Sequence, residues 1–130
     1  MKDAQTTELL QLNQRLLDTI ADADWAAYQE LCDPTLTALE PESHGQLVEG
    51  LAFHRFYFDL GGIRGRHRTT LCSPHVRLMG DTAVVAYGRL VQRVGPEGAA
   101  VTVATTETRV WQRQDGRWRH VHFHRSPAAG

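Results

Sequence analysis

Arginines that could bind an anion lie on the predicted strands of the C-terminal half, among them Arg89, Arg109 and Arg125. Period-2 alternation aligns them with residues that we expect to face the interior: Tyr87 and Val91, Trp111, and Val121 with Phe123. If all three point into one cavity, their charges repel. A bound carboxylate would relieve this repulsion, because each guanidinium is planar, always protonated and able to donate two parallel hydrogen bonds to a carboxylate. The alternative is that they pair internally, for example with Glu107 or Glu40, and only hold the sheet together.

Three histidines alternate along the last predicted strand, at His120, His122 and His124. Residues two apart on one strand face could chelate a metal. No Cys, Asp or Glu on the same strand face completes such a site, so we expect no metal here. We assign this row to the outer face of the sheet, where it meets a partner subunit or solvent. Val121, Phe123 and Arg125 then form the core-facing row.

His54, Tyr57 and Glu40 form a second set of residues with chemical potential, since they could supply acid–base groups to an enzyme. The aromatic residues around them are most simply explained as core. That a cavity of this kind would be catalytic rests on fold-level analogy alone. We therefore assign no catalytic residue and no cofactor.

The elements that must position these side chains begin with helices. Leucines at spacings of three and four predict a helix over residues 6–21. Asp24 is suited to cap a second helix, which Asp33-Pro34 ends because the residue before proline is biased out of the α region. A third helix is predicted after Gly50.

The second half of the chain has the pattern of strands joined by tight turns. Asp115-Gly116 is a strong hairpin signal, because a type I′ turn requires positive φ at both positions. Helices followed by strands are typical of an α+β fold, here a curved antiparallel sheet with three N-terminal helices over its concave face. The predicted strands span residues 35–39, 69–72, 76–79, 82–94, 99–112 and 117–124.

Length and composition predict one globular domain over residues 1–130. The net charge of −1 gives no indication of nucleic acid or of an anionic membrane surface as a partner. No apolar run approaches the roughly 20 residues that span a bilayer. Two cysteines without a signal peptide favour a reducing cytoplasm. Lys2 is the only lysine among many arginines, which favours a bacterial source.

Several strings resemble a known family. Glu107-Thr-Arg-Val-Trp111, Arg113-x-Asp-Gly-x-Trp118 and Val121-His-Phe-His-Arg-Ser126 are very similar to the end of the association (hub) domain of calcium/calmodulin-dependent protein kinase II. No kinase signature accompanies them: there is no glycine-rich loop, no His-Arg-Asp and no Asp-Phe-Gly. The resemblance covers nearly the whole chain, through Cys32-Asp-Pro34, Glu40-Pro-Glu42, Leu47-Val-Glu-Gly50, Phe53-His-Arg-Phe-Tyr-Phe58 and Pro74-His-Val76.

The resemblance implies a cone-shaped fold, shared with nuclear transport factor two, ketosteroid isomerase and the SnoaL-like polyketide cyclases. It implies a module that associates with itself, as a homodimer or a higher ring. It also implies a pocket for a small carboxylate, because Arg89, Arg109 and Arg125 match the family's pocket arginines and His54 matches its pocket histidine.

Tyr57 and Glu107 are additional candidates for this pocket. The alternative function is a SnoaL-like or ketosteroid-isomerase-like enzyme that acts on a small hydrophobic or acidic substrate in the same cavity. The contents of the cavity distinguish the two. A base that faces open apolar space favours catalysis, whereas three arginines around an anion favour binding.

Overall fold

The structure, a computed structural model, describes residues 2–128. Three α-helices precede the long strands, as expected for an α+β domain. Within the described residues, no helix is both long enough and apolar enough to cross a membrane. The elements are α1 (Lys2–Asp22), α2 (Trp25–Leu31), β1 (Cys32–Leu39), the 3-10 helix η1 (Pro41–Ser43), β2 (Val48–Glu49), α3 (Ala52–Asp59), β3 (His67–Met79), β4 (Thr82–Val94), β5 (Ala100–Gln114) and β6 (Arg117–Pro127).

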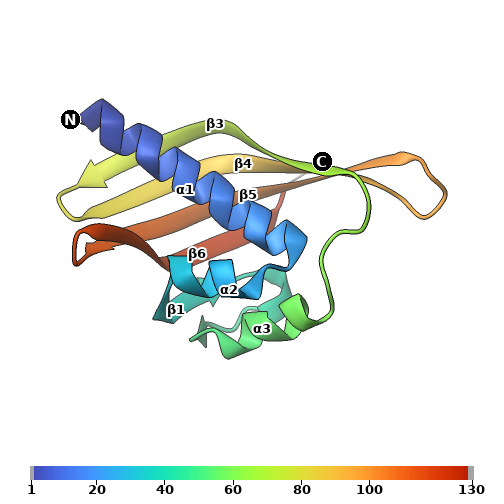
Figure 1. Ribbon diagram of the computed structural model, residues 1–130, viewed down its shortest axis with the longest axis horizontal. Coiled ribbons are helices and arrows are strands. Elements are labelled where there is room, and N and C mark those ends of the chain that lie inside the picture. The colour runs from blue at the N-terminus through green and yellow to red at the C-terminus, as the bar shows by residue number, and fades with distance from the viewer. Residues whose placement is uncertain (1, 129–130) are drawn as a thin grey trace.

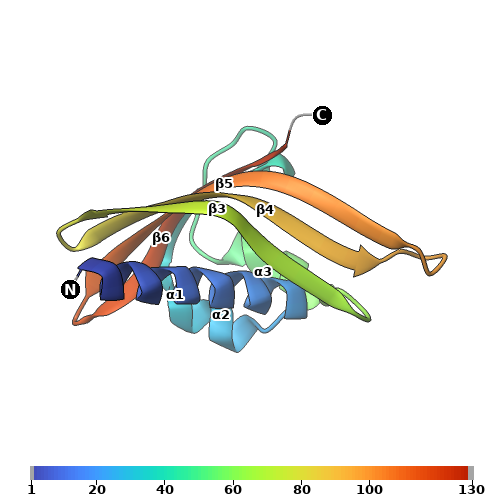
Figure 2. The same cartoon turned by 90° about the horizontal axis from the view of Figure 1, so that it is seen from above.

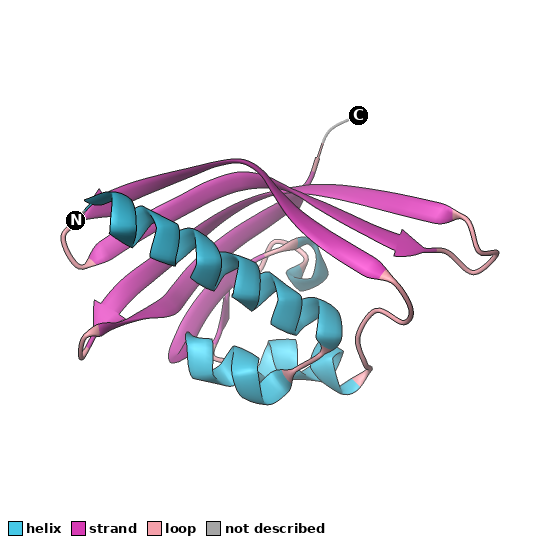
Figure 3. Ribbon diagram, turned by 45° about the horizontal axis from the view of Figure 1, so that its top comes forward, coloured by secondary structure: helices cyan, strands magenta, loops and turns pink. Residues whose placement is uncertain are grey.

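The strands form one curved sheet in the order β2-β1-β6-β5-β4-β3 (Figure 1). All three α-helices lie on its concave side, as Figure 2 shows from above. The β4–β5 hairpin extends beyond the helices (Figure 3). The predicted cone-shaped α+β fold is confirmed, with one refinement. β1 and β6 are parallel, which makes the sheet mixed, because these strands are distant in the chain and no hairpin sets their relative direction.

The apolar stripe of α1 packs against the concave face. Leu9, Leu16 and Leu17 are fully buried, so the predicted helix is confirmed. It begins at Lys2 rather than at residue 6, because the polar first turn carries no apolar periodicity to reveal it. Asp24 caps α2 as predicted, since its carboxylate accepts a hydrogen bond from the Ala27 N–H at 3.2 Å.

Several strands differ from their predicted extents: β5 and β6 end two and three residues later than predicted, and β2 was not predicted. β1 begins at Cys32 rather than at residue 35, and Pro34, which has no N–H to donate, lies where the β1–β6 register is interrupted. Residues 67–79 form one strand in place of two short ones, with a register shift at Ser73 and Pro74. The turn at Asp115-Gly116 has φ angles of 52° and 82°, as the type I′ prediction requires.

The predicted faces of β6 are wrong in its N-terminal half. The β5–β6 ladder shifts register at Val121, which has no partner on β5. His120, which the alternation rule assigned to the outer face, is therefore fully buried, and the core-facing row resumes only at Phe123. Beyond the shift the alternation holds, because Phe123 is buried and His124 is exposed.

Trp111 is fully buried, and its indole N–H donates to Asn13 Oδ1 at 3.0 Å, so its predicted inward orientation is confirmed. We expect Trp111→Ala to lower the free energy of unfolding by about 3–5 kcal/mol, because it leaves a cavity in the core. Trp111→Phe should cost less, since it keeps an aromatic ring and loses mainly the bond to Asn13. Chemical denaturation measures both. A loss below about 1 kcal/mol for the alanine variant would contradict the buried position.

Candidate functional site

A buried carboxylate, Glu107, organises the interior beneath the helices. It accepts hydrogen bonds from the Tyr87 hydroxyl (2.6 Å), Arg89 Nη1 (2.9 Å) and Arg109 Nε (3.0 Å). The donors converge because Tyr87 lies opposite Glu107 in the β4–β5 ladder and Arg109 follows two residues along the same strand face. Burial raises the pKa of Glu107, but Arg109, Arg89 and the Tyr87 hydroxyl outweigh it and lower the pKa to about 2.

Arg109 continues this network toward β1. Its Nη1 lies 3.4 Å from His120 Nε2, and His120 Nδ1 lies 3.5 Å from Cys32 Sγ. Because arginine can only donate, Nε2 of His120 accepts and the ring proton is on Nδ1, facing Cys32. Burial and the charge of Arg109 both lower the pKa of His120, which keeps the ring neutral. Burial raises the pKa of Cys32 to about 12, so this thiol is not activated as a nucleophile.

A pocket of about 260 Å³ lies beside this network, lined by residues of the sheet, of the three α-helices and of the turn that contains η1. Glu107 is not part of its lining and sits behind the arginines that it binds. The other five residues singled out from the sequence are brought together there: His54, Tyr57, Arg89, Arg109 and Arg125. The rest of the lining consists of Ile20, Tyr28, Glu40, Glu42, Phe58 and Phe123.

The three arginines are paired internally, which is the alternative that the sequence left open. Arg89 and Arg109 share Glu107. Arg125 contacts the carboxylate of Glu42, in a pair whose side chains are 19% and 38% exposed. The pocket therefore has the buried Arg109 and the partly buried Arg89, which share one carboxylate, and a third arginine whose partner is accessible to solvent.

Glu42 is a pocket residue that sequence reasoning missed. It lies in η1, a stretch with a loop pattern, and it pairs with Arg125, which is 83 positions away. Hydrogen bonding within the turn holds it in place, because the Glu40 N–H donates to Ser43 Oγ at 3.2 Å. No local pattern predicts this pair, since it depends on where the end of β6 passes the turn.

Two buried polar atoms of the pocket lining, Arg89 Nε and His54 Nδ1, have no hydrogen-bond partner among residues 2–128. The other ring nitrogen of His54, Nε2, lies 3.3 Å from Glu40 Oε2, so Glu40 pairs with this histidine. In the described part of the chain, no three His, Cys, Asp or Glu side chains form a group that could hold a metal ion.

Comparison with known proteins identifies the family. The sequence-family model of the calcium/calmodulin dependent protein kinase II association domain matches residues 5–129. The chain belongs to this family. It is 46% identical over 126 residues to the calcium/calmodulin-dependent protein kinase type II subunit delta of Oryctolagus cuniculus, an alignment that covers 95% of this chain and 24% of that protein. This association domain thus spans about a quarter of the length of that relative.

Solved structures agree with the family match. The association domain of the C. elegans kinase aligns with a TM-score of 0.90 and 44% identity, over 95% of this chain and 96% of that one. A nuclear transport factor 2-like protein from Salmonella enterica aligns with a TM-score of 0.80 and 22% identity, over 100% and 95% of the two chains. At that identity the likeness shows the fold alone. The resemblance inferred from the sequence is confirmed at the levels of family and fold.

We expect Glu107→Gln to destabilise this association domain by about 3–5 kcal/mol, because it leaves Arg109 as a buried charge without a full counter-ion. Glu42→Gln is the matched control, since it removes a carboxylate from a partly exposed pair that is worth about 1 kcal/mol or less. Urea denaturation at neutral pH measures both. Equal losses in the two variants would show that the Glu107 network is no stronger than a surface ion pair.

The pH dependence of stability gives the same prediction a second readout. The fold lowers the pKa of Glu107 from 4.5 to about 2, so its stabilising effect is complete above pH 4.5 and is lost as the pH falls from 4.5 toward 2. The stability difference between wild type and Glu107→Gln should therefore shrink across that window. A difference that stays constant there would contradict the role of the Glu107 carboxylate.

Proposed function

We propose that this chain is a self-associating association-domain module whose arginine-lined pocket binds a small carboxylate. Membership of the association-domain family supports the self-association. The observation that carries the ligand-binding half is that His54, Arg89, Arg109 and Arg125 line one pocket of about 260 Å³. These residues come from α3 and three different strands, so only the folded domain brings their donors together.

Two of the arginines offer positions to a ligand carboxylate. Arg89 donates Nη1 to Glu107, and its side chain is 11% exposed where it lines the pocket. Arg125 is held by Glu42, whose exposed side chain a ligand carboxylate can replace. Arg109 is already hydrogen-bonded to Glu107 and His120, so it would attract the ligand carboxylate through its charge. A planar carboxylate between Arg89 and Arg125 would thus gain charge-assisted hydrogen bonds.

We assign self-association to the convex face of the sheet. None of the helices α1–α3 covers this face (Figure 2). Alternation with the buried residues of β4 and β5 places small or β-branched side chains on it, among them Ala86, Thr106 and Thr108. Such a surface can pack closely against a second sheet, at a spacing of about 10 Å. The half-buried His122 and the exposed His124 continue the same face on β6.

We expect the chain to be at least a dimer at micromolar concentration, with a light-scattering mass of at least twice 14.6 kDa. Thr108→Arg places a long charged side chain on the convex face and should shift the protein toward monomer. Thr7→Arg, the same exchange at an exposed position of α1, is the control. A monomeric wild type would overturn self-association. A dimer broken by Thr7→Arg but not by Thr108→Arg would instead place the interface on the helical side.

Small carboxylates should raise the melting temperature by mass action on the folded state. We expect acetate and butyrate to exceed chloride at equal ionic strength, which controls for screening. Arg125→Lys keeps the charge but loses the fork and should weaken the response, and Arg125→Gln should remove most of it. Arg113→Gln, at a residue that lies over the Trp118 ring outside the pocket, should leave the response unchanged. If chloride stabilises the protein as much as acetate does, the arginines are purely structural.

A further inference from the structure

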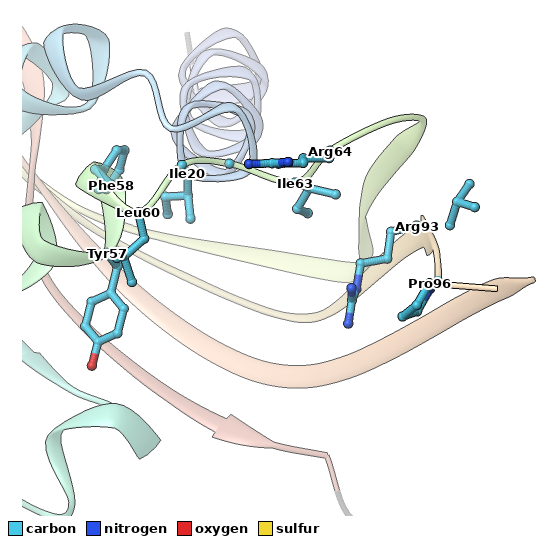
Figure 4. A pocket seen from close by; sticks show the side chains of 12 residues that line it. Ile20, Tyr57, Phe58, Leu60, Ile63, Arg64, Arg93 and Pro96 are labelled. Atoms are coloured by element: carbon cyan, nitrogen blue, oxygen red, sulfur yellow. The ribbon is translucent and has the colours of Figure 1, made fainter. Parts of the chain in front are cut away.

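A second, larger hollow adjoins the arginine pocket. Its volume is about 660 Å³, and it lies between the end of α3 with the loop that follows and the β4–β5 turn (Figure 4). The two hollows share three lining residues, Ile20, Tyr57 and Phe58. Figure 4 shows Tyr57 on one side of the larger hollow and Arg93 on the other. A molecule seated in the arginine pocket can therefore extend past Tyr57 into this space.

The loop that forms one wall of the larger hollow is anchored to α1. A Cβ on Gly62 would collide with the carbonyl oxygen of Ala21, so only glycine permits this close approach. The Ile63 N–H donates to the same oxygen at 2.7 Å. The hollow is thus bounded by backbone in a defined position, which a binding site requires.

The larger hollow combines apolar and cationic surfaces. Ile20, Phe58 and Ile63 provide its apolar lining. Arg64 and Arg93 also line it, and among residues 2–128 neither forms an ion pair with a carboxylate. Exposed apolar surface next to two arginines without a counter-ion is complementary to a hydrocarbon segment that ends in a negative charge.

We propose that the two hollows form one extended site for a linear dicarboxylate with a hydrocarbon middle. One carboxylate binds at Arg89 and Arg125, the hydrocarbon chain passes over Ile20 and Phe58, and the second carboxylate reaches Arg93. This proposal rests on the proposed function of the arginine pocket and adds an apolar spacer and a second charge to the ligand. The second charge-assisted contact is the reason why a dicarboxylate should bind more tightly than a monocarboxylate.

Titration calorimetry of the full chain can test the proposal with unbranched acids, from butyrate and succinate to decanoate and decanedioate. We expect the affinity of the dicarboxylates to pass through a maximum with chain length. At that maximum the dicarboxylate should bind about tenfold more tightly than the monocarboxylate of the same length, which is the effect of one further charge-assisted contact. The length at the maximum would report the spacing between the two anionic positions.

Replacing Arg64 and Arg93 together by glutamine should abolish the dicarboxylate advantage and leave butyrate binding unchanged. The matched control replaces Arg15 and Arg77 by glutamine, since both are exposed and line neither hollow. Arg125→Gln should weaken both classes of acid. If dicarboxylates bind no more tightly than monocarboxylates, the extended site is overturned. The same follows if their tighter binding persists after Arg64 and Arg93 are replaced. Neither result contradicts the arginine pocket. Failure of every acid overturns the ligand-binding half of the proposed function and, with it, this proposal.

Discussion

The ion pair between Arg109 and Glu107 is the constraint on which the interior of this domain depends. The Arg109 side chain is 1% exposed and cannot lose its proton, so the fold must supply a carboxylate beside it. Glu107 provides that carboxylate from the same strand face, and Tyr87 and Arg89 complete its hydrogen bonding. The concave face of the sheet therefore has a charged centre within the core, and the residues around that centre have little freedom to change.

The register shift at Val121 extends this network to β1. It turns His120 inward, where the ring fills the space between Arg109 and Cys32 and accepts a hydrogen bond that the guanidinium would otherwise leave unmade. The Phe123 ring makes a cation–π contact with the same guanidinium, with the ring centroid 4.2 Å from the Arg109 Cζ. The register shift in β6 thus gives the buried Arg109 a hydrogen-bond acceptor in His120. Under strict alternation His120 would face outward and could not reach Arg109.

This arrangement separates the structural part of the pocket from the part that can exchange partners. The buried arginine, Arg109, is compensated from within by the Glu107 carboxylate. Arg125, by contrast, is paired with the exposed Glu42, and Arg89 keeps one donor without a partner in the described residues. In the proposed function, an anion would meet a largely preorganised frame and would displace the solvent-accessible Glu42 side chain, which would keep the cost of binding low.

Local pattern was sufficient to predict the helices and the hairpin at Asp115-Gly116, because each depends on spacing within one element. The family resemblance indicated five residues that line one hollow of the structure: His54, Tyr57, Arg89, Arg109 and Arg125. The partners of those residues could not be predicted. The Arg125–Glu42 pair joins positions 83 residues apart, and the inward turn of His120 depends on a shift in strand register. Register and long-range pairing are set by how whole strands align in the packed sheet, so only the tertiary structure decided them.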